Sequence, residues 1–260
     1  MGNLSGLERS WESLAQRDAL AAILTDERKT GGRWDVTEFM ATGDAEIETV
    51  LQHLDAIGVH PNRGGAVLDF GCGVGRLTQA LARRFQSCVG VDISQEMITQ
   101  ANTLNHYGHC RYVVSATPQL PFADESFSLL YSNIVLQHVP RSYAVNYLRE
   151  FTRVLAPGGV MVFGVQDRFA TPDLASSLTR LRHILHPRSR VRSWIKGSGG
   201  EMQMHCLPER VVRQALGTAI IADMRYTNTA AKDFNGKLVY LQHPPRSGYV
   251  GRQYCVTKPA

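Results

Sequence analysis

The stretch AVLDFGCGVGR, residues 66–76, decides the fold of this chain. Its first part, AVLDF, is a short, mainly apolar run that predicts a buried strand. Three glycines at alternate positions then predict a sharp turn in which the backbone can approach a ligand closely. Leu77, Leu81 and Phe85 follow at helical spacing. Strand, glycine loop and helix in this order predict the first unit of a doubly wound α/β fold that binds a nucleotide-like ligand.

The rest of the chain alternates between short apolar runs and stretches with helical spacing. This alternation predicts parallel strands joined by right-handed crossovers, with a ligand crevice at the carboxyl ends of the strands. We therefore expect an α/β fold with a doubly wound, mostly parallel, seven-stranded Rossmann-like sheet. The later strands are expected at residues 88–92, 110–114, 128–132, 160–165, 220–226 and 251–257.

We expect a single domain over residues 1–260 with additions in two places. Residues 1–60 predict a helical lead-in or cap, because Ile47, Val50, Leu51 and Leu54 follow helical spacing. Residues 166–207 break the alternation and predict an insertion before the last two strands. The insertion is basic, because residues 179–200 contain six Lys or Arg and no acidic residue. The whole chain has a net charge of +5, so all other residues together have a net charge of 5 − 6 = −1.

The composition is that of a globular protein, with 43% hydrophobic and 20% charged residues. No apolar run is long enough to cross a membrane, and the first residues lack a signal pattern, so we expect a cytoplasmic protein. Five cysteines are spread along the chain without a Cys-x-x-Cys pair, which favours reduced thiols over disulfides or zinc. No metal is expected.

Three details indicate which nucleotide-like ligand the glycine loop binds. Its spacing is G-x-G-x-G, and Arg76 occupies the third glycine site of a dinucleotide motif. Asp69 precedes the loop, where a carboxylate would repel a pyrophosphate but attract the ammonium of S-adenosylmethionine (SAM). Asp92 ends the next strand, where a carboxylate can accept hydrogen bonds from ribose hydroxyls. The only Tyr-x-x-x-Lys pair lies at the C-terminus, so a dinucleotide reductase is disfavoured.

The chain resembles the class I SAM-dependent methyltransferases of the small-molecule type, the methyltransferase type 11/25 group. The resemblance covers about residues 34–165 in the family's order and spacing. It is carried by VLDFGCGVGRLT (67–78), GVDIS (90–94), LPFADESFSLLYSNIVLQHV (120–139) and LREFTRVLAPGGVMVF (148–163).

The resemblance implies roles for individual residues. Asp69, Gly71 and Gly73 would line the aminoacyl part of SAM, Asp92 would bind the ribose hydroxyls, and Ile93 would lie against adenine. Similar proteins usually have an Asp before the LPF segment, where this chain has Val114-Ser115-Ala116-Thr117. Either Ser115 or a backbone carbonyl replaces it, or adenine recognition is weaker. The full set of expected cofactor-binding residues is Asp69, Gly71, Gly73, Arg76, Asp92, Ile93, Ser115, Ala116, Ser132, Asn133, Trp34 and Phe39.

Trp34 and Phe39 belong to a segment, residues 34–43, that is poorly periodic in sequence. Two interpretations stay open for it. One is a helix–helix corner whose aromatic residues pack on the core. The other is a flap over the ligand site, which one branch of the family has at a similar segment.

Methyl transfer from a sulfonium requires mainly that the acceptor atom is held behind the methyl carbon, and a hydroxyl acceptor also requires a base. His138 and His205 are the candidate catalytic bases. The alternative for His138 is a structural contact at the methionine end of the cofactor, and for His205 it is a surface position. Ser132 and Asn133 would lie near the transferable methyl.

The expected function is methyl transfer from SAM to an oxygen, nitrogen or carboxylate of a small molecule, possible partners being a metabolite, sugar, lipid or acid. No Asn/Asp-Pro-Pro run follows the fourth strand and no Pro-Cys pair occurs, so nucleic acid is not an expected partner. Residues 179–196 are a solvated surface, a lid that attracts an anionic acceptor, or a peripheral membrane contact that suits a lipid-like one. Two alternatives stay open: a non-catalytic SAM-binding regulatory protein, and an RNA methyltransferase using this basic segment.

Overall fold

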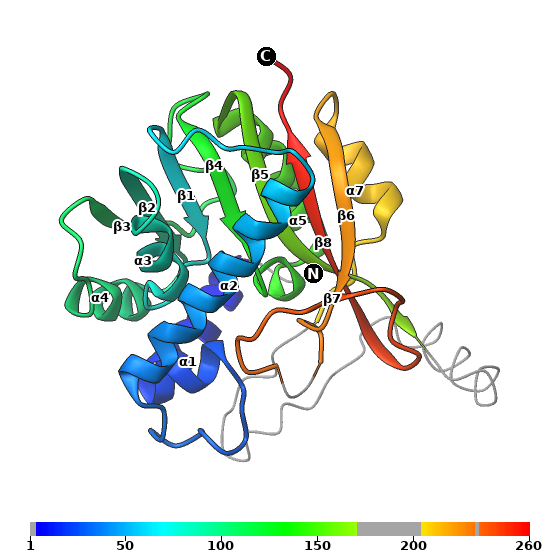
Figure 1. The fold of residues 1–260 in the computed structure, drawn as a ribbon. Coiled ribbons are helices and arrows are strands. Elements are labelled where there is room, and N and C mark those ends of the chain that lie inside the picture. Colours follow the sequence, from blue (N-terminus) through cyan, green and yellow to red (C-terminus); the bar gives the residue numbers. More distant parts are fainter. Residues whose placement is uncertain (1–3, 171–203, 232–233) are drawn as a thin grey trace.

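The computed structural model describes residues 4–170, 204–231 and 234–260, and these form one mixed, eight-stranded sheet (Figure 1). The order across the sheet is β3-β2-β1-β4-β5-β8-β6-β7. Strands β1 to β5 are parallel, whereas β8 is antiparallel to both β5 and β6. The strands are β1 Ala66–Phe70, β2 Ser87–Asp92, β3 Cys110–Val114, β4 Phe127–Ser132, β5 Leu155–Ala170, β6 Ile220–Thr227, β7 Tyr240–Leu241 and β8 Gly248–Thr257.

The predicted fold class is confirmed, with one strand more than expected. The seven predicted strands are all present, and the two-residue β7 adds an eighth at the edge beside β6. Strand β5 is much longer than predicted and continues to Ala170, so the first residues of the expected insertion are strand. Most of that insertion, residues 171–203, lies outside the described residues, and so does the basic segment 179–196.

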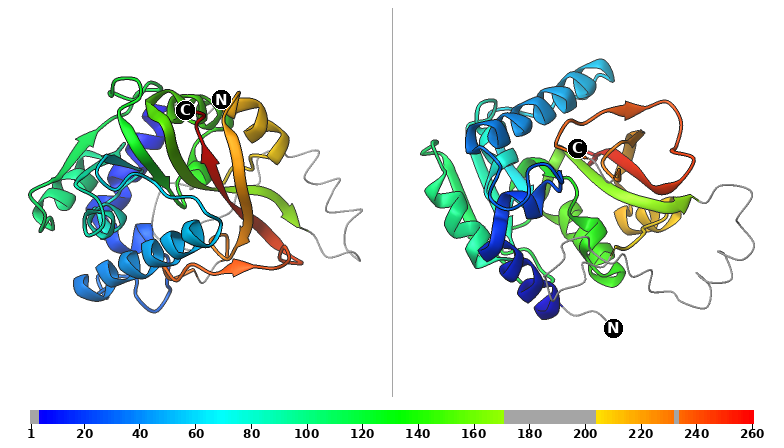
Figure 2. Two further views of the ribbon diagram at one scale, coloured as in Figure 1. Left: turned by 45° about the horizontal axis from the view of Figure 1, so that its top comes forward. Right: turned by 90° about the horizontal axis from the view of Figure 1, so that it is seen from below.

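Helices cover both faces of the sheet, as a doubly wound fold requires (Figure 2). One apolar cluster joins α5 and α7 to side chains such as Leu68, Leu130 and Phe163. A second joins α2 and α3 to the opposite face at Val67, Leu129 and Val162. The helices are α1 Leu4–Ile23, α2 Val36–Ala56, α3 Arg76–Ala82, α4 Gln95–Thr103, α5 Arg141–Val154 and α7 Glu209–Leu216, with a 3₁₀ turn η1 at Leu136–His138.

The lead-in consists of α1 and α2, and its corner is shorter than the sequence suggests. Asp35 caps α2, since its carboxylate accepts a hydrogen bond from the backbone N–H of Glu38 at 2.9 Å. Residues 36–43 are therefore the first turns of α2. Helix α1 is broken at Asp18, whose backbone is non-helical and whose carboxylate accepts from the N–H of Ala21 at 3.1 Å.

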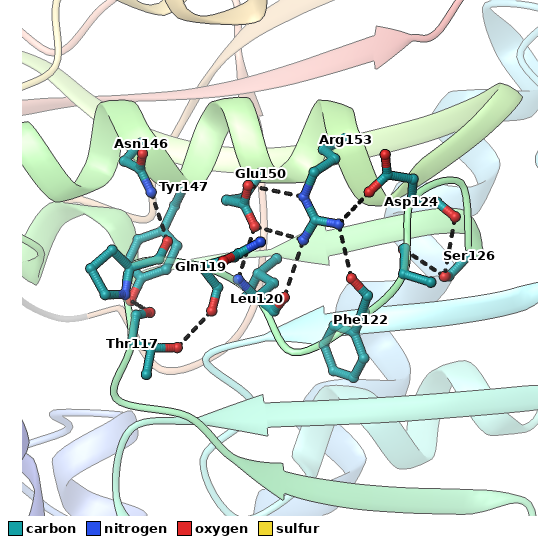
Figure 3. A network of polar contacts seen from close by, with 12 residues as sticks. Thr117, Gln119, Leu120, Phe122, Asp124, Ser126, Asn146, Tyr147, Glu150 and Arg153 are labelled. Carbon is teal, nitrogen blue, oxygen red and sulfur yellow. Dashed lines mark hydrogen bonds and ion pairs between the residues drawn. The ribbon is translucent and has the colours of Figure 1, made fainter.

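Arg153 on α5 holds the loop that leads into β4 (Figure 3). Its guanidinium donates to the carbonyls of Leu120 and Phe122 at 3.1 and 2.9 Å, and to the carboxylates of Glu150 and Asp124. Glu150 also accepts from the N–H of Leu120 at 2.9 Å. The motifs at 120–127 and 148–155 therefore form one unit, which lies where β4 and β5 begin, at the amino end of the parallel strands.

Candidate active site

The glycine loop between β1 and α3 has a conformation that few other residues could adopt. Gly71, Gly73 and Gly75 have φ values of +75°, +52° and +85°. A Cβ on Gly71 would lie 2.4 Å from Val135, and one on Gly73 would lie 2.5 Å from Ile23. The loop therefore packs closely against its surroundings, and Gly71 and Gly73 line the cavity described below.

Asp92, at the end of β2, faces the loop. Its carboxylate accepts hydrogen bonds from the backbone N–H of Gly73 at 2.9 Å and of Ser94 at 3.0 Å. Burial raises the pKa of this carboxyl, and the N–H donors oppose that shift. The side chain is thereby held at the rim of the ligand cavity, with further acceptor capacity for hydroxyl donors.

Asp69, at the end of β1, is 1% exposed and is only half satisfied. One carboxylate oxygen accepts from the Thr78 hydroxyl at 2.6 Å, while Oδ1 has no hydrogen-bond partner in the structure. Burial raises its pKa to about 7, against the opposing effect of the Thr78 hydrogen bond. A buried carboxylate oxygen without a donor fits the ammonium that the sequence predicts for this position.

A buried ionic network beneath the loop contains a residue that sequence reasoning missed. Glu46, on α2, is fully buried and pairs with Arg76 at 2.8 Å. It also accepts hydrogen bonds from the Tyr131 hydroxyl and the Asn133 amide, each at 2.8 Å. The network joins the lead-in, the start of α3 and the end of β4. The one available signal was an acidic residue on the apolar face of a helix, beside Ile47.

A cavity of about 1630 Å³ opens at the carboxyl ends of the parallel strands, where the fold predicts the ligand crevice. One half is lined by the glycine loop, Asp92 and neighbouring residues. The other half is walled mainly by apolar and aromatic side chains from α1, from α5 and from the C-terminal strands and their loops. Among these wall residues are Leu7, Trp11, Tyr147, Phe169, Met204, Phe234, Leu241 and Tyr249.

The predicted cofactor residues divide into those that line this cavity and those that support it. The lining residues are Gly71, Gly73, Arg76, Asp92, Ile93, Ser115 and Asn133. Ser132 is behind the wall and donates to the carbonyl of Phe70 at 3.0 Å. Trp34 and Phe39 pack edge to face, 5.4 Å apart, in a third apolar cluster beside Leu24. Asp69 and Ala116 are also outside the lining.

The two candidate bases have different positions. His138, in η1, lines the cavity and meets the edge of Trp11 with ring centroids 5.5 Å apart. His205 is not among the lining residues, and its backbone N–H donates to the carbonyl of Gln137 at 2.7 Å. Burial lowers the pKa of His205, so its imidazole is neutral at physiological pH.

Helix α1 lines the cavity and is fastened to α4. The carboxylate of Glu12 accepts from the Ser94 hydroxyl at 2.7 Å and from the backbone N–H of Glu96 at 3.1 Å. These donors belong to the N-terminus of α4, where a carboxylate is favoured by the helix dipole. Sequence reasoning missed Glu12 as well, because nothing in α1 marks its partner.

Ile134 is a further residue that the sequence did not indicate. It follows Asn133 and has a φ of +54°, which is costly for a β-branched side chain. The Asn133 side-chain oxygen accepts from its N–H at 3.1 Å. The strained turn directs residues 133–135 to the cavity, since all three line it.

The described residues contain neither a metal cluster nor a membrane helix. Within residues 4–170, 204–231 and 234–260, no three His, Cys, Asp or Glu side chains gather in a way that could hold a metal ion. Over the same ranges, no helix is both long and apolar enough to cross a bilayer.

The fold and the site together define a class of protein. The glycine loop, the half-satisfied Asp69 and the rim carboxylate of Asp92 fit the aminoacyl and ribose parts of SAM. They do so at the carboxyl edge of a sheet whose parallel half is followed by an antiparallel strand. This is the architecture of a class I SAM-dependent methyltransferase domain.

Comparison with known proteins gives the same family. A family model described as a methyltransferase domain matches residues 68–163. A carboxy-S-adenosyl-L-methionine synthase of Pseudomonas paraeruginosa is 31% identical over 152 residues, covering 54% of this chain and 60% of the relative. A malonyl-(acyl-carrier protein) O-methyltransferase of Halorhodospira halophila is 34% identical over 119 residues, covering 45% and 39%. Residues 68–163 therefore match a methyltransferase domain, in agreement with the fold and the geometry of the site.

A solved structure of a methyltransferase has a similar fold. Magnesium protoporphyrin IX methyltransferase of Synechocystis PCC 6803, with bound SAM, superimposes with a TM-score of 0.59 at 17% identity, covering 99% of this chain and 98% of that one. The chain spans only 60% and 39% of the two curated relatives, and their names denote two different reactions. The activity of this chain is therefore argued from its own site.

Proposed function

We propose that this chain is a SAM-dependent methyltransferase that acts on a small molecule. The observation that carries the proposal is the single continuous cavity that joins the glycine loop and Asp92 to a second, apolar half. Its volume of about 1630 Å³ exceeds the roughly 300–1,000 Å³ typical of a one-ligand pocket. The cavity has room for an acceptor beside the cofactor, as group transfer between two bound molecules requires.

Each polar group around the glycine loop has a role in holding SAM. Asp92, which lines the cavity, would accept hydrogen bonds from the ribose hydroxyls. Asp69 Oδ1, which is buried behind the lining without a partner, would accept from the ammonium group directly or through water. Arg76 and Asn133 are both held by Glu46, so their orientation is fixed before SAM binds. SAM supplies a methyl group on a sulfonium sulfur, which leaves as a neutral thioether when the methyl is transferred.

The acceptor half contributes positioning and exclusion of water. Trp11 and the other apolar walls hold the acceptor in a dry environment next to the cofactor half, and such orientation alone can supply several kcal/mol of the barrier. When the acceptor is a hydroxyl, His138 takes its proton, because this imidazole lines the cavity. His205 is not among the lining residues, so it is the second candidate.

Transfer of labelled methyl groups tests the proposal. The protein is incubated with methyl-labelled SAM and with separated small-molecule, lipid and RNA fractions of an extract. We expect label in a small-molecule or lipid fraction. Label in RNA would instead support an RNA methyltransferase, and SAM binding without any transfer would support a regulatory SAM-binding protein.

A thermal shift experiment tests the cofactor half separately. SAM and S-adenosylhomocysteine should raise the melting temperature, because a ligand that binds only the native state stabilises it. NAD is the control and should have no effect. Stabilisation by NAD alone would contradict the assignment of the glycine loop.

A further inference from the structure

Gln166, in the acceptor half of the cavity, is a buried amide without a partner. It lines the cavity and is 1% exposed, yet neither Oε1 nor Nε2 has a hydrogen-bond partner. Its backbone carbonyl accepts from the N–H of Leu207 at 2.7 Å. An unpaired buried amide costs stability, so its position indicates that a ligand supplies the missing hydrogen bonds.

The neighbouring residue, Asp167, has the side-chain partners that Gln166 lacks. Asp167 is also buried, but its carboxylate pairs with Arg168 and Arg252 and accepts from the N–H of Glu209 at 3.4 Å. The register shift between Gln166 and Arg168 makes Asp167 the extra residue of a β-bulge. The bulge lies where β5 reaches the cavity, so Gln166 can face the ligand while Asp167 faces α7.

Two hydroxyls lie on the same side of the sheet as Gln166. Gln166 pairs with Gly251 of β8, and Gly251 pairs with Thr227 of β6, so the three residues form one row across the sheet. Because Gly251 has no side chain, the Thr227 and Thr229 hydroxyls lie over it, each about 3.0 Å from where a Cβ would be. They bond each other at 2.8 Å and line the cavity. We call Gln166, Thr227 and Thr229 the amide–hydroxyl site.

The chemistry of this site selects for an uncharged group. Gln166 offers one acceptor and two donors, and a hydroxyl pair that shares one hydrogen bond keeps one O–H for a third partner. The only Asp, Glu, Lys or Arg residues among the described lining residues are Glu27, Arg76 and Asp92. Arg76 is paired with Glu46. Among the described residues, a carboxylate here would therefore have no counter-charge, and it would face the oxygen of Gln166.

We propose that the amide–hydroxyl site binds an uncharged acceptor group that both donates and accepts hydrogen bonds, such as a carboxamide or a hydroxyl, on a mainly apolar molecule. The inference rests on the proposed function and narrows its acceptor class. It replaces the anionic acceptor that the basic segment suggests by a neutral one.

Ligands that share one apolar body but differ in their polar group test this proposal. Octanamide, methyl octanoate, octanoate and octylamine are titrated against Nile red bound to the protein saturated with S-adenosylhomocysteine. Octanamide should displace the dye from the wild type at a concentration at least about tenfold below the other three. Gln166→Leu should remove most of this preference, and Thr229→Val should reduce it.

Leu241→Ala is the matched control, because Leu241 lines the same cavity and carries no hydrogen-bonding group. It should weaken the binding of all four probes by similar factors and keep their order. The proposal is overturned by the same preference in Gln166→Leu as in the wild type, by tightest binding of octanoate, or by the absence of dye displacement.

Calorimetric titration of each variant with SAM separates this inference from the proposed function. Gln166→Leu should bind SAM like the wild type, since Gln166 is outside the glycine loop. SAM binding and methyl transfer without selectivity among the probes would refute the inference alone. Failure of the wild type to bind SAM would refute the proposed function, whatever the probes show.

Discussion

Asp69 is the residue whose protonation should control cofactor binding. Burial raises its pKa to about 7, so near neutral pH the carboxyl is divided between its two forms. Only the ionised form attracts the ammonium of SAM, so binding favours loss of the proton. We expect SAM affinity to rise between about pH 6 and pH 7, with proton release on binding. Calorimetry in buffers of different ionisation enthalpy measures both.

Asp69→Asn is the variant that checks this assignment. It should bind SAM more weakly and with little pH dependence. An affinity that falls as the pH rises, or an unchanged slope in Asp69→Asn, would show that another group titrates. The stability of the fold without SAM should change with pH in the opposite direction to SAM affinity. The pKa of Asp69 is higher in the folded than in the unfolded state, so this carboxyl contributes less to the free energy of unfolding as the pH rises from about 4 to about 7.

Sequence patterns were enough to locate the candidate cofactor residues that belong to a strand end or a glycine turn. Gly71, Gly73 and Asp92 are defined by their place in a local strand–loop–helix unit, so a linear pattern is enough to find them. Glu46 and Gln166 depend on what the fold brings opposite them. Glu46 meets Arg76 and Asn133 from other elements, and Gln166 is notable only because no partner reaches it.

At the scale of elements, the Glu46–Arg76 pair connects α2 to the start of α3. Glu46→Gln would leave the Arg76 charge buried without compensation, which should cost about 3 kcal/mol of unfolding free energy in urea denaturation. Glu48→Gln is the matched control, because Glu48 lies on the same helix and pairs with Arg84 at 2.7 Å in an exposed position. Its cost should stay below about 1 kcal/mol.

The double variant Glu46→Leu, Arg76→Met extends this test. Removing both charges should recover a large part of the lost stability, since no charge is then buried alone. SAM affinity should remain reduced, because Asn133 also loses its anchor. Equal costs for Glu46→Gln and Glu48→Gln would contradict the network's structural importance.

Arg153 should be irreplaceable by lysine. The planar guanidinium reaches two carbonyls and two carboxylates at once, whereas an ammonium cannot match this fork (Figure 3). Arg153→Lys should lower the free energy of unfolding by about 2 kcal/mol. Arg213→Lys, which alters an exposed pair with Glu209 on α7, should have almost no effect. Similar losses in both variants would refute the special role of Arg153.

Glu12 should control how firmly α1 is held against the cavity. Glu12→Ala removes the two hydrogen bonds to the N-terminus of α4, so the amides of α1 should exchange with deuterium roughly tenfold faster. The amides of β1 and β4 should be unaffected. Gln16→Ala, at an exposed position of α1, is the control. Unchanged exchange in Glu12→Ala would mean that apolar packing alone holds the helix.

The elements that the sequence missed are short or depend on the rest of the fold. Strand β7 has two residues, too few for any periodic pattern, and it exists because β6 offers it an edge. Helix α2 begins at Val36 although residues 34–43 lack a clear period. Its N-cap at Asp35 and the burial of Phe39 in the third apolar cluster compensate for the weak pattern.

For the whole molecule, the sequence predicted the order of the strands along the chain but not the shape of the cavity. Local strand–helix alternation is enough to imply a doubly wound sheet. The acceptor half is assembled from α1, α5 and the loops of the C-terminal strands, which are far apart in the chain. The uncharged lining of the acceptor half therefore forms only when these segments come together in the fold. The charge of residues 179–196 does not indicate it.

The central claim is that the glycine loop and Asp92 bind SAM in this cavity. Equilibrium dialysis with methyl-labelled SAM tests it most directly, for the wild type and for Asp92→Ala, with circular dichroism confirming that both are folded. The account predicts one SAM per chain for the wild type and an affinity at least about tenfold lower for Asp92→Ala, because a charged hydrogen-bond acceptor for the ribose is lost. No binding by the folded wild type, or equal binding by both proteins, would contradict it.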